Sequence, residues 1–140
     1  MSSFAPRVIH SALDEIERIY EAQQKNRAAV ASTTAAQRIA KLRALERAML
    51  ERRDEIRAAM WADYRKPAAE VDLSEILPVV SEARHAIRHL RRWMKPERVG
   101  SPLTLFGSRS WVRYEPKGVV LVISPWNFPF NLSLGPVISA

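Results

Sequence analysis

The chain has 140 residues, no cysteine and a formal net charge of +7. The absence of cysteine excludes disulfides, thiolate metal sites and a cysteine nucleophile within these residues. Of the 22 Lys and Arg residues, only Arg109, Arg113 and Lys117 follow residue 100, so a charged part of the chain precedes an apolar part. This shift in composition predicts a domain boundary near residue 100.

The basic charge suggests two kinds of partner, nucleic acid and an anionic membrane surface. Basic and acidic residues are interleaved, however, and no motif that reads DNA or RNA accompanies them. We therefore expect solvated helix faces, with no nucleic acid and no membrane as a partner. Residues 1–9 lack the apolar core of a secretory signal, which predicts a cytoplasmic protein.

Two helices are predicted in the first half of the chain. The first should begin at Ser11, a good N-cap followed by acidic residues, and run to about Val30. Thr34 and Gln37 then form a capping-box pattern that starts a second helix, which ends at about Tyr64. Apolar residues recur along this second helix with a helical period and are expected to face the core: Ile39, Leu42, Leu45, Met49, Ile56 and Met60.

A third helical stretch is predicted over residues 68–94, followed by an extended segment. Pro78 interrupts the helix and should kink it. Its expected core-facing residues are Leu73, Ile76, Leu77, Val80, Ile87, Leu90 and Met94. Residues 100–115 should be extended, with strand at Trp111, Val112 and Tyr114 and a turn at Gly107 and Ser108.

Two features of the third helix resemble binding sites. His85 and His89 have the spacing of two zinc ligands, but Ala86 stands where the zinc-protease motif has glutamate, and no third ligand follows nearby. We therefore expect surface histidines and no metal. A basic stripe on the same helix either contacts a phosphate or a partner, or is simply solvated, and it consists of Arg84, Arg88, Arg91, Arg92 and Lys95.

The most informative segment is the tail, from Gly118 to Ala140, which carries no charged residue. Residues 119–123 form an apolar run typical of a strand covered on both faces, although nothing else in the chain could cover it. Pro125 and Pro129 keep the preceding residues out of the helical region, and Pro129 suits the first position of a helix. The tail is therefore predicted as strand, loop and helix of an α/β fold.

Asn127 lies in the predicted loop at the carboxyl end of that strand, where open α/β sheets bind their ligands. A transmembrane span is the competing interpretation of so apolar a tail. The three prolines and two asparagines of the tail argue against a span. The four glycines of the chain fall into no dinucleotide-binding or phosphate-loop spacing.

The segment Lys117-Gly-Val-Val-Leu-Val-Ile-Ser-Pro-Trp-Asn-Phe-Pro-Phe-Asn-Leu132 closely resembles the strand and loop that open the cofactor domain of aldehyde dehydrogenases. The helices and the sequence Trp111-Val-Arg-Tyr-Glu-Pro116 are similar to the N-terminal part of the same family. The short lead resembles its class 3 branch, and residues 103–111 lean toward members that resemble coniferyl aldehyde dehydrogenase. The resemblance implies an aldehyde dehydrogenase-like α/β fold. Residues 1–100 would be the N-terminal helical part, residues 101–116 the arm of the oligomerisation region, and residues 117–140 the truncated start of the NAD(P)-binding domain.

The resemblance also implies a chemistry. In this family a cysteine thiolate attacks an aldehyde, hydride passes to NAD or NADP, and a glutamate-activated water releases the carboxylic acid. Asn127 would donate its side-chain NH₂ to the oxyanion, while Phe128 and Leu132 would line the substrate tunnel. The nicotinamide ribose would lie beside Ile123, Ser124, Pro125 and Trp126.

The family's cysteine, its glutamate base and the side chains that bind adenosine would lie beyond Ala140. The leading hypothesis is therefore an N-terminal fragment of an NAD(P)-dependent aldehyde dehydrogenase, a homodimer when full length and inactive alone. A second hypothesis is a truncated assembly protein that pairs with a full-length subunit. A third is a basic helical module for nucleic acid or membrane surfaces. Reading the coding sequence past Ala140 would discriminate the first from the second.

Overall fold

The computed structural model describes residues 6–140, with side chains from Leu13 onward. These residues form two compact units. One unit contains the first helix and residues 116–121, and the other contains residues 34–115 and 122–140. The candidate functional residues from Ser124 onward all lie in the second unit.

The first unit is built on α1 (Pro6–Ala31). The predicted start at Ser11 is wrong, because residues 6–10 are already helical and Pro6 suits the first helical position. The predicted break after the helix is confirmed. The hydroxyls of Ser32 and Thr33 donate to backbone carbonyls of the last turn, at 2.8 and 2.6 Å, which satisfies acceptors that a helix end leaves free.

The second predicted helix forms as two helices, α2 (Ala35–Glu51) and α3 (Arg53–Tyr64). The capping box is confirmed, since the backbone N–H of Gln37 donates to the Thr34 hydroxyl and that of Thr34 donates to the Gln37 side chain. The prediction of one continuous helix is wrong, because the backbone bends at Arg52, with φ −95° and ψ 15°. The buried side chains of α3, Ile56 and Met60, join the core beyond this bend.

The third helical stretch is divided into α4 (Ala68–Val71), a π-helical turn (Asp72–Ile76) and α5 (Leu77–Trp93). The interruption predicted at Pro78 is confirmed, and it takes the form of this wide turn immediately before the proline. The turn changes which residues face inward: Leu73 and Leu77, predicted in the core, are exposed. Met94, also predicted in the core, is exposed because it lies just beyond the end of α5. Ile76 and Val80 are buried as predicted, and the other buried residues of the stretch are Val71, Glu75, Val79, Ala83 and Ala86.

A hairpin follows α5, with β1 (Glu97–Val99) antiparallel to β2 (Ser110–Val112). The predicted strand at Trp111 and Val112 is confirmed, while Tyr114 lies outside it. The tip contains a short 3₁₀ turn (Leu103–Leu105) and Gly107, whose φ of 88° suits a residue without a side chain.

Residues 119–123 form neither helix nor strand in the described chain, so the buried strand predicted there is not observed. The side chains of Leu121 and Ile123 are 81% and 85% exposed. A parallel strand requires neighbouring strands, and the described residues supply none to this segment. The helix predicted from Pro129 is confirmed as α6 (Pro129–Ser139), with the proline in its first turn.

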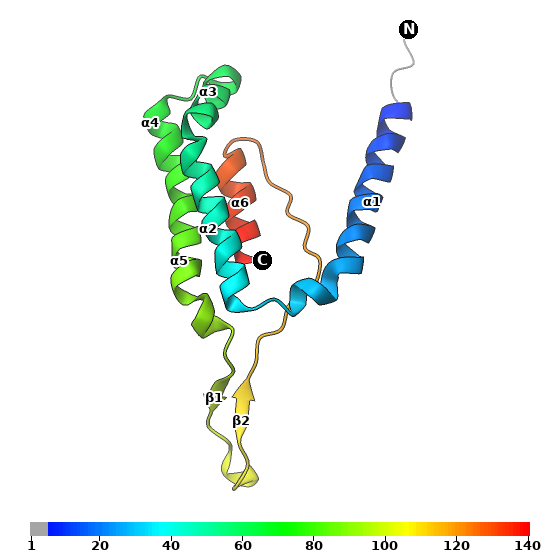
Figure 1. Ribbon diagram of the computed structural model, residues 1–140, viewed down its shortest axis with the longest axis vertical. Helices are drawn as coiled ribbons and strands as arrows, with labels where there is room; N and C mark the ends of the chain where they lie inside the picture. Colours follow the sequence, from blue (N-terminus) through cyan, green and yellow to red (C-terminus); the bar gives the residue numbers. More distant parts are fainter. Residues whose placement is uncertain (1–5) are drawn as a thin grey trace. The chain divides into compact units, whose positions relative to one another are not determined.

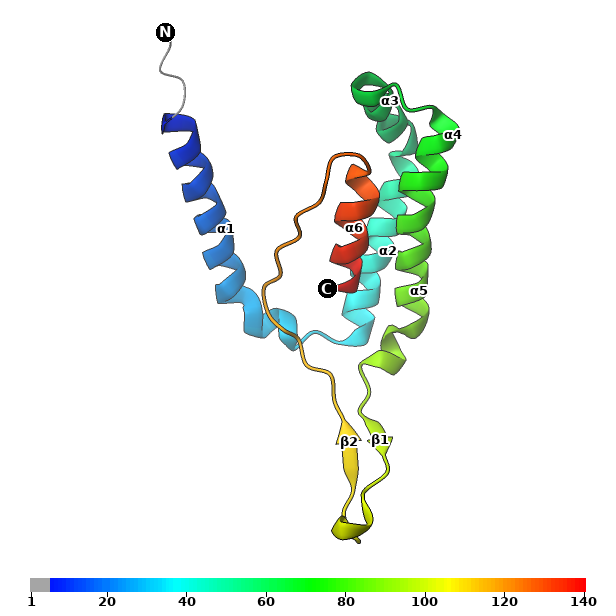
Figure 2. The ribbon, with the colours of Figure 1, turned by 180° about the vertical axis from the view of Figure 1, so that it is seen from behind.

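Within the second unit, α5 packs against both α2 and α6, as both views of the ribbon show (Figures 1 and 2). The core between these helices consists of Met49, Ile56, Met60, Val71, Ile76, Val79, Val80, Ala83, Ala86 and Ile138. It fixes α6 against α5 and the π-helical turn. No helix among the described residues is long and apolar enough to cross a membrane.

Candidate functional site

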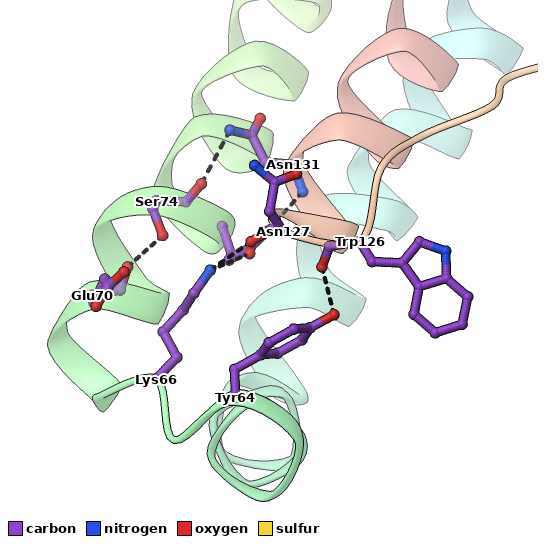
Figure 3. A network of polar contacts seen from close by, with 8 residues as sticks. Tyr64, Lys66, Glu70, Ser74, Trp126, Asn127 and Asn131 are labelled. Atoms are coloured by element: carbon purple, nitrogen blue, oxygen red, sulfur yellow. Dashed lines mark hydrogen bonds and ion pairs between the residues drawn. The ribbon is translucent and has the colours of Figure 1, made fainter.

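The loop that contains Asn127 rests on the turn between α3 and α4 (Figure 3). The Tyr64 hydroxyl donates to the backbone carbonyl of Trp126 at 2.6 Å. The Lys66 ammonium donates to the backbone carbonyl of Asn127 at 3.0 Å. Two successive carbonyls of the loop are thus held by two side chains from one turn.

The backbone of the turn explains how Lys66 reaches the loop. Arg65 takes a left-handed conformation, with φ 56°, and is the one residue other than glycine with positive φ in the described chain. The N–H groups of Arg65 and Lys66 donate back to the carbonyls of Trp61 and Met60, which ends α3. Pro67 then continues in an extended conformation, and the Lys66 side chain between them is 8% exposed.

Glu75 is the buried partner of Lys66. Its side chain is completely buried, and one carboxylate oxygen lies 2.9 Å from the Lys66 ammonium. The other oxygen accepts the backbone N–H of Asn131 at 3.0 Å. Asn131 lies in the first turn of α6, so the carboxylate accepts from an N–H that has no partner within the helix. The negative charge of Glu75 also interacts favourably with the positive end of the helix dipole.

Pro78 contributes to the same network because it has no backbone N–H. A proline has no N–H to donate to the carbonyl four residues earlier, which here belongs to Ser74. That carbonyl instead accepts the side-chain amide of Asn131 at 3.0 Å. The π-helical turn is therefore connected to the start of α6 by two hydrogen bonds from one residue, through Ser74 and Glu75.

The Asn127 side chain is exposed, and it forms no hydrogen bond with any residue that the structure describes. Its backbone is held while its amide stays available. The neighbouring residues predicted to contact a cofactor are also accessible, with Ile123 and Trp126 85% and 83% exposed. Ser124 donates to or accepts from the Ser133 hydroxyl at 2.6 Å, which ties the loop to α6.

The two residues predicted to line a substrate tunnel have different surroundings. Phe128 is half-buried, and the Lys66 ammonium lies 4.2 Å from the centre of its ring. This cation–π contact gives the buried cation one more favourable partner. Leu132, four residues further along, is exposed on α6.

Sequence reasoning missed the residues that hold the loop, namely Tyr64, Lys66, Ser74, Glu75 and Asn131. One signal was available for Glu75, because it stands midway between Val71 and Val79 at helical spacing on a face that is otherwise apolar. A carboxylate in that position predicts a buried polar partner. The partner itself, nine residues earlier and beyond a turn, had no local signal.

The histidines of α5 interact with each other. The Nδ1–H of His89 donates to the backbone carbonyl of His85 at 2.8 Å, and the two rings lie 4.2 Å apart. Trp93 stacks on His89 one turn later. Within the described residues, no group of three His, Cys, Asp or Glu side chains could hold a metal ion.

The family model described as "Aldehyde dehydrogenase family" matches residues 6–140. The chain is 39% identical to aldehyde dehydrogenase family 3 member B1 of Bos taurus over 91% of its own length and 26% of that protein. It is 45% identical to the chloroplastic aldehyde dehydrogenase family 3 member I1 of Arabidopsis thaliana over 74% of its length and 19% of that protein. A solved structure, the substrate-bound state of Staphylococcus aureus AldH, matches 88% of this chain with a TM-score of 0.83 at 29% identity.

These similarities confirm the predicted α/β, aldehyde dehydrogenase-like fold class, of which this chain contributes mainly helices and a small sheet. The chain spans 27% of the matched structure and 19 to 26% of the relatives named above. With a family match over all of the described residues, the chain belongs to the aldehyde dehydrogenase family.

Proposed function

We propose that this chain is the N-terminal part of a cytoplasmic, NAD(P)-dependent aldehyde dehydrogenase that oxidises an aldehyde to a carboxylic acid. The observation that carries the proposal is the state of Asn127. Its backbone carbonyl and that of Trp126 are held by buried or anchored donors, while its side-chain amide has no partner among the described residues. An exposed donor that is held in place, without a partner among the described residues, suits a group that meets charge only during a reaction.

The charge in question develops on the aldehyde oxygen. When a thiolate adds to the carbonyl carbon, the carbon–oxygen π electrons move to oxygen, which becomes an oxyanion. The Asn127 NH₂ would donate a hydrogen bond to that oxygen. Because an amide is neutral, it stabilises the oxyanion without transferring a proton to it. The thiolate belongs to a cysteine outside this chain, which contains none.

The residues proposed to hold the nicotinamide side of NAD or NADP are Ile123, Ser124, Pro125 and Trp126. The exposed apolar side chains of Ile123 and Trp126 suit a planar ring, and no charged side chain follows Lys117. When bound, the cofactor accepts hydride. The glycines of this chain offer no cradle for the pyrophosphate, which we assign to other parts of the enzyme.

We propose Phe128 and Leu132 as residues of the substrate tunnel, because both are apolar and flank the loop of Asn127. Strand β2 and the tip of the hairpin lie within the proposed arm, residues 101–116, and β1 directly precedes it; through this arm the full-length enzyme would form a homodimer. Residues at its tip, Leu103 and Phe106, are among the most exposed apolar side chains of the chain. Residues 1–100 would be the N-terminal helical part and residues 117–140 the start of the cofactor domain.

The proposal is tested in the full-length enzyme, the polypeptide that continues this chain through the cysteine and glutamate segments. Asn127→Ala should lower kcat for aldehyde-dependent NAD(P)H formation by about 10²- to 10³-fold, the usual effect of removing one oxyanion donor. Asn26→Ala, the same change on the exposed face of α1, is the matched control and should leave kcat unchanged. Unchanged turnover in Asn127→Ala would remove the assignment.

A further inference from the structure

Asn127 lies between two peptide groups that are both fixed from one side. The carbonyl before it, that of Trp126, accepts from Tyr64, and its own carbonyl accepts from Lys66. A residue has only two freely rotating backbone dihedrals, and these set the orientation of the two flanking peptide planes. Holding both planes therefore fixes the direction in which the Cα–Cβ bond of Asn127 leaves the backbone.

Lys66 is itself rigidly held. Its ammonium contacts the Glu75 carboxylate at 2.9 Å and lies over the Phe128 ring at 4.2 Å, and its side chain is 8% exposed. Glu75 is completely buried and also accepts the N–H of Asn131, so one carboxylate joins the lysine to the first turn of α6. The loop of Asn127 is thereby fixed both at its middle and at its downstream end.

A buried ion pair is a costly way to stabilise a fold. Removing two charges from water costs about as much as their attraction returns, and apolar side chains of similar volume often stabilise as well or better. The Lys66–Glu75 pair does what apolar side chains could not do, because it supplies a donor to the Asn127 carbonyl and an acceptor to the Asn131 N–H. Its geometry points to a role in placing the loop.

We infer that Lys66, supported by Glu75 and Tyr64, is a positioning residue that aims the Asn127 amide at the reacting carbonyl oxygen, an inference that rests on the function proposed above for Asn127. None of the three residues touches substrate or cofactor in this role. They act through the backbone of the loop, so their effect on the reaction depends on the Asn127 side chain.

The test is a double-mutant cycle in the full-length enzyme. Lys66→Met keeps the length and apolar stem of the side chain but removes the donor, and should lower kcat about 10- to 100-fold through misplacement of Asn127. Tyr64→Phe removes one hydroxyl from a partly exposed side chain and should lower kcat by about 3- to 10-fold. In the Asn127→Ala background, neither change should lower kcat further, because the group that they position is gone. The KM for NAD(P) should stay constant.

Arg57→Met is the matched control. It breaks an ion pair with Asp72 in the same region that does not contact the loop, and should leave kcat unchanged. Equal losses of kcat with and without Asn127 would mean a purely structural effect and would overturn the inference, as would full activity in a folded Lys66→Met.

If Lys66→Met does not fold, Tyr64→Phe alone tests the positioning role. In that case an unchanged kcat for Tyr64→Phe overturns the inference. The proposed function is judged separately, because it fails only if Asn127→Ala keeps its turnover. Loss of turnover in Asn127→Ala with a fully active, folded Lys66→Met would overturn the positioning role alone.

Discussion

Glu75 occupies the middle of a buried helical face, between Val71 and Val79, where an apolar side chain would ordinarily stand. It is tolerated there because both of its oxygens have hydrogen-bond donors, the Lys66 ammonium and the Asn131 N–H. The free-energy cost of burying a carboxylate is offset only while both donors are present. The burial of Glu75 therefore depends on both Lys66 and Asn131.

Replacing Glu75 by Gln should destabilise the protein by about 3 to 5 kcal/mol, because the change leaves the Lys66 ammonium buried without a counter-charge. The free energy of unfolding from urea denaturation measures this effect. Glu70→Gln is the matched control on an exposed position of the same stretch, and should change the free energy by less than about 0.5 kcal/mol. Equal effects of the two substitutions would show that the buried pair contributes nothing to folding.

At the level of elements, α3 is joined to the π-helical turn by the pair of Arg57 and Asp72. The Arg57 Nε–H donates to one carboxylate oxygen at 2.9 Å, and a second guanidinium nitrogen contacts the other oxygen. The hydrogen bonds from Arg57 lower the pKa of Asp72 below its ordinary value. A carboxylate whose pKa is lower in the folded state stabilises the fold above its unfolded pKa, and this contribution is lost as the pH falls through the folded pKa.

Asp72→Asn should therefore remove a pH-dependent part of the stability. The difference in the free energy of unfolding between the parent protein and the variant should be largest near neutral pH. It should shrink as the pH falls below the usual range of aspartate. Chemical denaturation at several pH values measures the difference, and a difference that stayed constant down to strongly acidic pH would contradict the assigned cause.

The elements differ in how well their sequences predict them. The capping box of Thr34 and Gln37 and the helix start at Pro129 were predicted correctly, since both depend on contacts within a few residues. The burial of Leu73 and Leu77 was predicted wrongly, because the π-helical turn shifts the register of the inward face. The turn precedes Pro78 and hydrogen-bonds to Asn131 of α6, which is more than fifty residues away in the sequence.

At the level of the whole molecule, part of the candidate site could be predicted from the sequence and part could not. Asn127 and its loop could be proposed as a site from the pattern of prolines and the resemblance to a family, because both depend on adjacent residues. The Lys66–Glu75 pair could not, since it depends on a left-handed turn at Arg65 and on contacts with α6. Residues 119–123 have a sequence typical of a strand but form none, because the described residues supply no neighbouring strand to pair with them.

The chain alone should not oxidise aldehydes, because none of its residues is cysteine and the proposed reaction needs a thiolate. The purified 140-residue chain, mixed with an aldehyde and either NAD or NADP, should show no increase in NAD(P)H absorbance. Appreciable turnover would contradict the proposed mechanism, since it would require a nucleophile other than cysteine.

The central claim is that the Asn127 amide stabilises the oxyanion formed during the first chemical step. The most direct test is the rate constant of the first-turnover burst of NAD(P)H in the full-length enzyme, followed by stopped flow at saturating aldehyde and cofactor. For Asn127→Ala we predict a rate constant lower by about 10²- to 10³-fold, with an unchanged Kd for NAD(P). A burst as fast as that of the parent enzyme would contradict the claim.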